Sequence, residues 1–182
     1  KFSELWTGDE PMLAQLRLSW WRETLTRDEN EWPEGEPLLA ALRSWNGQHR
    51  SLSALVDGWE ALTGTAPLPP GALREMAEGR AASFAALARS LALEQEAETA
   101  SHLGRQWAAA DLAMRLGHSQ ERSAATALVA EGKDRRPRVS RSLRPLLVLH
   151  GLAHRRLEKG DEAAALSPAA MLKAMRLGFL GF

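Results

Sequence analysis

Hydrophobic side chains recur at helical spacing along most of the chain. The segment from Glu10 to about Leu25 begins with an acidic residue followed by proline, a combination that favours a helix N-terminus. Two apolar stripes run along it: Leu18, Trp21 and Leu25 form one, and Leu13, Leu16 and Trp20 form the other. A helix that is apolar over much of its circumference is usually buried on several sides. We therefore predict a central position for this helix.

Glycines, prolines and breaks in the apolar pattern delimit further helices. We expect them at about residues 37–45, 52–62, 71–93, 96–116, 120–130, 140–157 and 168–178. The stretch 26–37 carries five acidic side chains and two prolines, a composition typical of an exposed loop.

Composition supports the same helical interpretation. The chain has 31 Ala and 30 Leu among 182 residues, but only 4 Val and no Ile or Tyr. Ala and Leu are strong helix formers, whereas strands favour β-branched and aromatic residues. We therefore predict an all-α fold in a single domain over residues 1–182. The seven Trp residues are expected to add bulk to a core of small side chains or to line a cavity.

Charge and cysteine content exclude several classes of function. Lys and Arg total 23, Asp and Glu total 23, and there is no cysteine. The chain therefore has no thiol nucleophile, thiolate metal site or disulfide, and its neutrality argues against nucleic acid as a partner. No run of 18 apolar residues occurs, so we expect no transmembrane segment and a cytoplasmic location, with peripheral membrane association left open. Because the chain starts at Lys1 rather than Met, we also expect that an upstream segment is missing.

Two groups of side chains on predicted helices have spacings that suit a metal ion. His150, His154 and Glu158 follow one another at intervals of four residues, which can place two imidazoles and a carboxylate on one ion. The neighbouring arginines disfavour a cation there, so we predict no metal and favour surface or capping histidines. Asp57 and Glu60 also share one helix face and lie among apolar residues. They are either a cavity-facing pair able to hold Mg²⁺ or, as we favour, part of a solvated face.

The segment 132–144 is strongly basic, with six Lys or Arg residues and one Asp. Arg138 and Arg141 are its candidate ligand-binding residues, because arginine forks bind diphosphates and anionic lipid head groups. The alternative is a solvated loop that balances the acidic stretch at 26–37. The sequence leaves both readings open.

Three segments carry a family resemblance. The run EPMLAQLRLSWWRETL at residues 10–25 resembles the Arg-Leu-x-Trp-Trp-Arg-Glu helix of the squalene and phytoene synthases. The segments LSALVDGWE at 52–60 and SRSLRPLL at 140–147 are similar to later stretches of that family, in the same order. The resemblance implies an isoprenoid-synthase helical bundle around a central apolar cavity. It also implies Arg17, Trp20, Trp21 and Arg115 as ligand-binding residues.

The chain departs from this family at its metal-binding motifs. Active members hold Mg²⁺ with two aspartate-rich motifs. The bound Mg²⁺ neutralises the negative charge of the diphosphate leaving group. The first motif would precede the helix at residue 10 and is absent from residues 1–9. At the second, Leu112 and Leu116 stand where polar ligands are expected, and Asp111 is the only aspartate near it. This pattern is similar to a divergent branch, the mitochondrial complex I assembly factor and its bacterial relatives.

The leading hypothesis is therefore a non-catalytic member of the family that binds an isoprenoid or another lipid, or that acts as an assembly or interaction protein with a protein partner. It needs no cofactor. The alternative is an active prenyltransferase that condenses isoprenyl diphosphates with Mg²⁺, and Asp57, Glu60 and Asp111 are its candidate catalytic residues. A third hypothesis is a helical scaffold whose cavity is filled by side chains.

Overall fold

The computed structural model describes residues 11–132 and 138–181, and within them the protein is all-α. The main helices are α1 (Pro11–Thr26), α2 (Pro37–Leu42), α3 (Ser53–Ala61), α4 (Pro70–Ser90), α5 (Ala97–Arg115), α6 (Ser119–Ala130), α7 (Arg144–Lys159) and α8 (Pro168–Leu180). Short 3₁₀ turns lie between several of them, and the described residues contain no strand. The all-α prediction is confirmed. Each expected helix is present, with ends that differ by a few residues.

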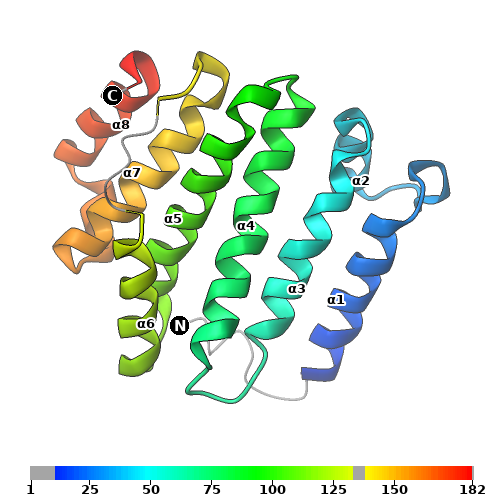
Figure 1. Ribbon diagram of the computed structural model, residues 1–182, viewed down its shortest axis with the longest axis horizontal. Helices are drawn as coiled ribbons and strands as arrows, with labels where there is room; N and C mark the ends of the chain where they lie inside the picture. The colour runs from blue at the N-terminus through cyan, green and yellow to red at the C-terminus, as the bar shows by residue number, and fades with distance from the viewer. Residues whose placement is uncertain (1–10, 133–137, 182) are drawn as a thin grey trace.

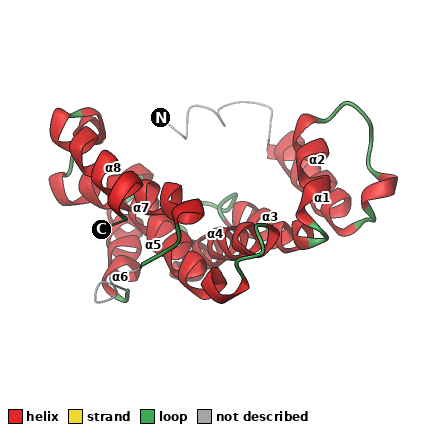
Figure 2. Ribbon diagram, turned by 90° about the horizontal axis from the view of Figure 1, so that it is seen from above, coloured by secondary structure: helices red, strands yellow, loops and turns green. Residues whose placement is uncertain are grey.

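The helices form a single curved layer. Neighbours follow the order α1, α3, α4, α5, α7 and α8, with α1 and α8 at the two ends (Figure 1). Seen from above, the layer is concave on one side, and α6 packs against α4 and α5 on the outer side (Figure 2). None of the helices in the described ranges is both long and apolar enough to cross a bilayer.

Small residues allow the central helices to approach one another closely. Gly104 of α5 faces α4, and a Cβ atom at this position would lie 2.8 Å from the Arg80 carbonyl oxygen. Gly58 of α3 is equally close to α4, because a Cβ there would lie 2.7 Å from the Met76 Cα. Ala108 to Ala110 of α5 are fully buried, and so are the larger side chains of Leu73 and Met76 on α4. The middle of the layer is therefore packed closely at its glycines and filled elsewhere by buried apolar side chains.

The position of α1 differs from the prediction. Leu18 and Trp21 pack on a buried cluster that includes Leu25, so the first predicted stripe faces the protein. The second stripe does not, because Leu16 is 59% exposed and Trp20 is 40% exposed. The prediction of a central helix was wrong, since α1 is the last helix of the layer and, among the described residues, its main helix neighbour is α3 (Figure 1).

The acidic stretch after α1 is also more ordered than expected. Trp32 is buried within it, and its indole Nε1 donates a hydrogen bond to the Thr24 carbonyl oxygen over 2.7 Å. Asp28 caps a 3₁₀ turn at Glu29–Glu31 by accepting a hydrogen bond from the Asn30 amide. The acidic side chains are mostly exposed, as predicted, but Trp32 anchors the segment to the end of the layer.

Candidate functional site: arginines around Asp111

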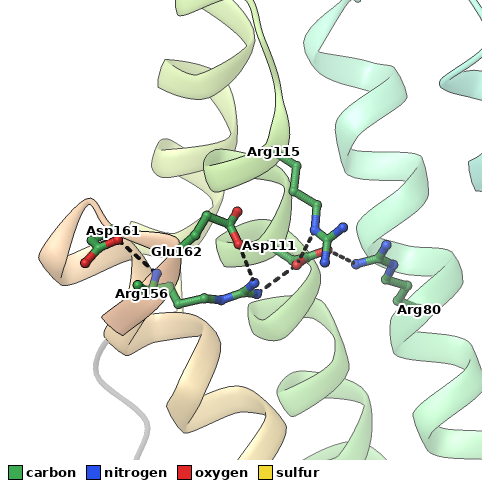
Figure 3. A network of polar contacts seen from close by, with 7 residues as sticks. Arg80, Asp111, Arg115, Arg156, Asp161 and Glu162 are labelled. Atoms are coloured by element: carbon green, nitrogen blue, oxygen red, sulfur yellow. Dashed lines mark hydrogen bonds and ion pairs between the residues drawn. The ribbon is translucent and has the colours of Figure 1, made fainter. Parts of the chain in front are cut away.

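Asp111 of α5 lies at the centre of a cluster of three arginines. Its carboxylate accepts hydrogen bonds from Arg115 Nε at 2.8 Å, Arg156 Nη2 at 2.9 Å and Arg80 Nη1 at 3.1 Å (Figure 3). Arg156 also pairs with Glu162 at 3.4 Å. The Asp111 side chain is only 6% exposed, so this carboxylate is satisfied inside the protein rather than by water. We call these five residues the arginine cluster.

The layer itself brings the cluster together. Arg115 follows Asp111 by one helical turn, whereas Arg80 comes from α4 and Arg156 from α7, the two helices that flank α5. On the other side of α5, Gln106 donates a hydrogen bond to the Leu128 carbonyl oxygen of α6. Asp111 comes five residues later, a rotation of about 140° around the helix. The arginine cluster therefore lies on the side of α5 away from α6, and Figure 2 shows that the side of the layer opposite α6 is the concave one.

The charges in the arginine cluster shift the pKa values of its buried members. Burial alone raises the pKa of Asp111, but the hydrogen bond from Arg115 and the charge of Arg80 outweigh it, so this pKa lies below its ordinary value. Burial lowers the pKa of Arg80, and the charge of Asp111 opposes that shift, but guanidinium groups remain charged in proteins. The cluster therefore holds an ionised carboxylate among three guanidinium groups.

Aromatic side chains adjoin the cluster. The Arg80 guanidinium lies 4.6 Å from the centroid of Trp107 and 5.8 Å from that of Trp59. Trp107 in turn stacks on Phe84, with ring centroids 5.4 Å apart. All three aromatic residues are only partly buried. A cationic group beside partly exposed aromatic rings suits a ligand with an anionic head and an apolar body.

Asp57 and Glu60, the carboxylate pair that the sequence offered as a Mg²⁺ site, also bind an arginine. Arg22 of α1 donates to Asp57 Oδ1 from Nε at 2.9 Å and from Nη2 at 2.7 Å, and it also binds Glu60. The Asp57 and Glu60 side chains are 45% and 51% exposed. The hydrogen bonds that Arg22 donates to Glu60 and Asp57 raise the pKa of Arg22 above its ordinary value. The pair is thus a partly solvated link between α1 and α3, and it is not buried in a cavity.

The histidines of α7 are not surface caps. The rings of His150 and His154 lie 4.2 Å apart and are half-buried, and His154 Nε2 is a buried atom without a hydrogen-bond partner. Burial lowers the pKa of His150 to about 3 and also lowers that of His154. In the described ranges, no group of three His, Asp or Glu side chains is arranged to hold a metal ion. The expectation of surface histidines was wrong, because α7 turns this face towards its neighbours.

The remaining predicted ligand residues do not converge on Asp111. Arg17 and Trp20 are exposed on α1 and Trp21 packs inward, and α3 and α4 separate α1 from α5 (Figure 1). Arg138 and Arg141 are exposed before the N-terminus of α7, about 18 Å along that helix from Arg156.

The rest of the basic segment, residues 133–137, lies outside the described residues. Of the six predicted ligand-binding residues, only Arg115 belongs to the arginine cluster.

Sequence reasoning missed Arg80 and Arg156. Arg80 lies in an alanine-rich helix with no motif around it, and Arg156 was considered only as a charge that disfavours a metal. The available signal was that Arg80 is a lone charge among small apolar residues over positions 79–88, where a charge needs a buried partner. The position of its partner could not be read from the spacing, because Asp111 is 31 residues away.

A pocket of about 500 Å³ lies on the α6 side of the layer, apart from the arginine cluster. Its lining is polar and includes Arg74, Glu78, His102, Arg105, Gln106 and Glu131. Arg74 pairs with Glu131 and Arg105 with Glu78 across its rim.

No family model, curated protein or solved structure that was compared with the chain matches it.

Proposed function

We propose that this protein is a divergent member of the squalene and phytoene synthase family that binds an anionic isoprenoid or related lipid on its concave face and does not condense it. The phosphate head group lies at the arginine cluster, with Arg115 as the most exposed of its guanidiniums. The apolar part lies along Trp59, Trp107 and Phe84. A protein with this function needs no metal ion.

The observation that carries the proposal is that arginines occupy every candidate magnesium carboxylate. Asp111 is held by Arg80, Arg115 and Arg156, and Asp57 and Glu60 are held by Arg22. Mg²⁺ needs carboxylate oxygens that are open to it, together with water and substrate phosphates. Binding the ion at Asp111 would mean breaking three charge-assisted hydrogen bonds first. This supports ligand binding without metal chemistry over the active transferase.

The ligand class follows from the chemistry of the cluster. A guanidinium fork binds phosphate oxygens in two parallel hydrogen bonds, which are stronger than bonds between neutral groups. The three guanidinium groups suit an anionic head group, and the neighbouring indole rings favour an apolar chain over a polar sugar or nucleotide. An isoprenyl diphosphate combines both features, and the sequence resemblance points to the same ligand class.

Isothermal titration with farnesyl diphosphate and geranylgeranyl diphosphate tests the proposal. We expect binding in EDTA that is unchanged by added Mg²⁺, and no release of pyrophosphate during prolonged incubation. Binding that requires Mg²⁺, or formation of a C30 or C40 product, would overturn the proposal in favour of the active transferase. Absence of binding to either compound would favour the interaction-protein alternative, which the exposed apolar stripe of α1 supports.

Arg115→Gln locates the site. Arg115 is 40% exposed, so its loss should spare the fold while removing one charge-assisted contact, which weakens binding about tenfold or more. Arg17→Gln on the exposed surface of α1 is the matched control and should leave binding unchanged. Equal effects of the two substitutions would show that the ligand does not lie at the arginine cluster.

A further inference from the structure

The last helix, α8, turns a stripe of large apolar side chains to solvent. Met171, Leu172, Met175 and Phe179 are 68%, 69%, 47% and 70% exposed. They follow the spacing i, i+1, i+4, i+8, which places them on one helix face. The opposite face carries Leu177 and the fully buried Ala170 and is turned towards α7. The stripe therefore belongs to the outer edge of the layer (Figure 1).

The surroundings of this stripe are basic. Within α8, Lys173 and Arg176 are the only charged residues, and both are positive. At the C-terminal end of α8, Arg144 of α7 donates a hydrogen bond to the Phe179 carbonyl oxygen, so the start of α7 lies against it. Arg141 and Arg138 precede Arg144 and are exposed. The contacts thus place Arg144 at this edge together with Arg176, while the segment that carries Arg138 and Arg141 also touches Glu96, which accepts a hydrogen bond from the Ser140 amide. The acidic pair Asp161 and Glu162 precedes the other end of α8.

The first helix supplies an internal comparison. Met12, Leu13, Leu16 and Trp20 of α1 are exposed at the same i, i+1, i+4, i+8 spacing. Beyond α1, however, the chain enters the acidic stretch 26–37, at the opposite end of the layer from α8 (Figure 1). The two edges match in apolar pattern, and each has an exposed arginine five residues after its first methionine, Arg17 and Arg176. They differ in that an acidic stretch follows α1, so we expect a preference for an anionic partner at the α8 edge.

We propose that α8 docks the protein on the surface of a bilayer that contains anionic lipids. The four apolar side chains enter the boundary between head groups and acyl chains, as those of amphipathic interfacial helices do. Arg176 extends to lipid phosphates beside the stripe, whereas Lys173 packs towards Gly151 of α7 and adds its charge from the inner side of the helix. Arg144, with Arg141 and Arg138 before it in the chain, adds attraction at the C-terminal end of α8. The helix lies along the membrane surface, since α8 is too short to cross it.

Co-sedimentation with vesicles tests this proposal. We expect binding to vesicles of phosphatidylcholine with 30% phosphatidylglycerol, and at least tenfold weaker binding to phosphatidylcholine alone. Because exposed charges are screened by salt, binding to the anionic vesicles should fall strongly between 0.05 and 0.5 M NaCl. Equal binding to both vesicle types, or binding to neither, would overturn the proposal.

Paired variants assign the surface. Leu172→Gln with Phe179→Gln should lower vesicle binding about tenfold or more, while the matched pair Leu13→Gln with Leu16→Gln on α1 should leave it unchanged. Lys173→Gln with Arg176→Gln should lower it by about fivefold for each charge. All six side chains are at least partly exposed, so circular dichroism should show intact folds. Equal losses in the α1 and α8 pairs would refute docking by α8.

Light scattering distinguishes a second copy of the chain as the occupant. If the wild-type chain is a dimer that the α8 pair converts to a monomer, and vesicles do not bind, then α8 is a subunit interface and the proposal fails. The proposal is independent of the ligand proposed above: Arg115→Gln should lower ligand affinity and leave vesicle binding unchanged.

Discussion

Replacing Asp111 by Asn removes one negative charge from the arginine cluster with almost no change in shape. The wild-type carboxylate joins three helices, since its partners Arg80, Arg115 and Arg156 come from α4, α5 and α7. An asparagine side chain keeps one oxygen acceptor and adds an NH₂ donor, which points at guanidinium donors. We expect this substitution to weaken the packing of α4 and α7 on α5.

The burial of each partner sets the magnitude. The side chains of Arg80 and Arg156 are 11% and 13% exposed, so both would remain charged and poorly hydrated without the carboxylate. Removing one member of a buried ion pair costs about 3–5 kcal/mol. Arg156 retains Glu162 at 3.4 Å and Arg80 retains the face of Trp107, which places the expected loss near the lower end, about 3 kcal/mol.

Asp57→Asn is the matched control, because it makes the same chemical change at an exposed ion pair. Asp57 is 45% exposed and Arg22 is 37% exposed, and Arg22 keeps Glu60 as a partner. Exposed pairs contribute about 0–1 kcal/mol. Urea unfolding followed by circular dichroism measures both free energies of unfolding. If Asp111→Asn costs less than about 1 kcal/mol, or no more than Asp57→Asn, the arginine cluster does not stabilise the packing of α4, α5 and α7.

Three further outcomes follow from the described contacts. The free energy of unfolding should fall by about 1.4 kcal/mol per pH unit as the pH drops from about 6.5 towards 3. The reason is that His150 binds a proton in the unfolded chain over this range but not in the folded chain, where its pKa is about 3. A flat profile of urea midpoint against pH would contradict this. Gly104→Ala should cost about 1–3 kcal/mol because its Cβ would lie 2.8 Å from a carbonyl oxygen of α4, and Gly71→Ala, where that space is open, should cost nothing measurable by thermal melting. Trp32→Phe should lower stability by about 1 kcal/mol or more, because the buried Thr24 carbonyl loses its indole donor; a melting temperature equal to that of the wild type would show that Trp32 does not anchor the acidic stretch.

The sequence predicted the helices well because their signals are local. Leu and Ala content, the periodicity of apolar residues and the position of Pro and Gly act within a few turns. Pro168, for example, lies at the start of α8 next to Ser167, whose hydroxyl accepts a hydrogen bond from the Ala170 amide. Such features require no knowledge of which helices become neighbours.

Neighbour order was not readable in the same way, and the candidate site depends on it. The two stripes of α1 indicated burial on both faces, but only the position of α1 at the end of the layer shows that one stripe is exposed among the described residues. The same holds for Asp57 and Glu60. Their spacing suits a metal ion, but the tertiary structure pairs both of them with Arg22 of α1. The family resemblance identified candidate residues one helix at a time, and of these only Arg115 belongs to the arginine cluster.

For this chain, local chemistry along the sequence was sufficient for the helical class, the approximate ends of each helix and the separation of acidic and basic segments. Tertiary structure alone decided that Asp111 accepts hydrogen bonds from Arg80, which is 31 residues away in the sequence, and from Arg156, which is 45 residues away. The physical reason is that helix formation depends on interactions within a few residues, whereas the partner of a buried charge depends on which helix surfaces pack together.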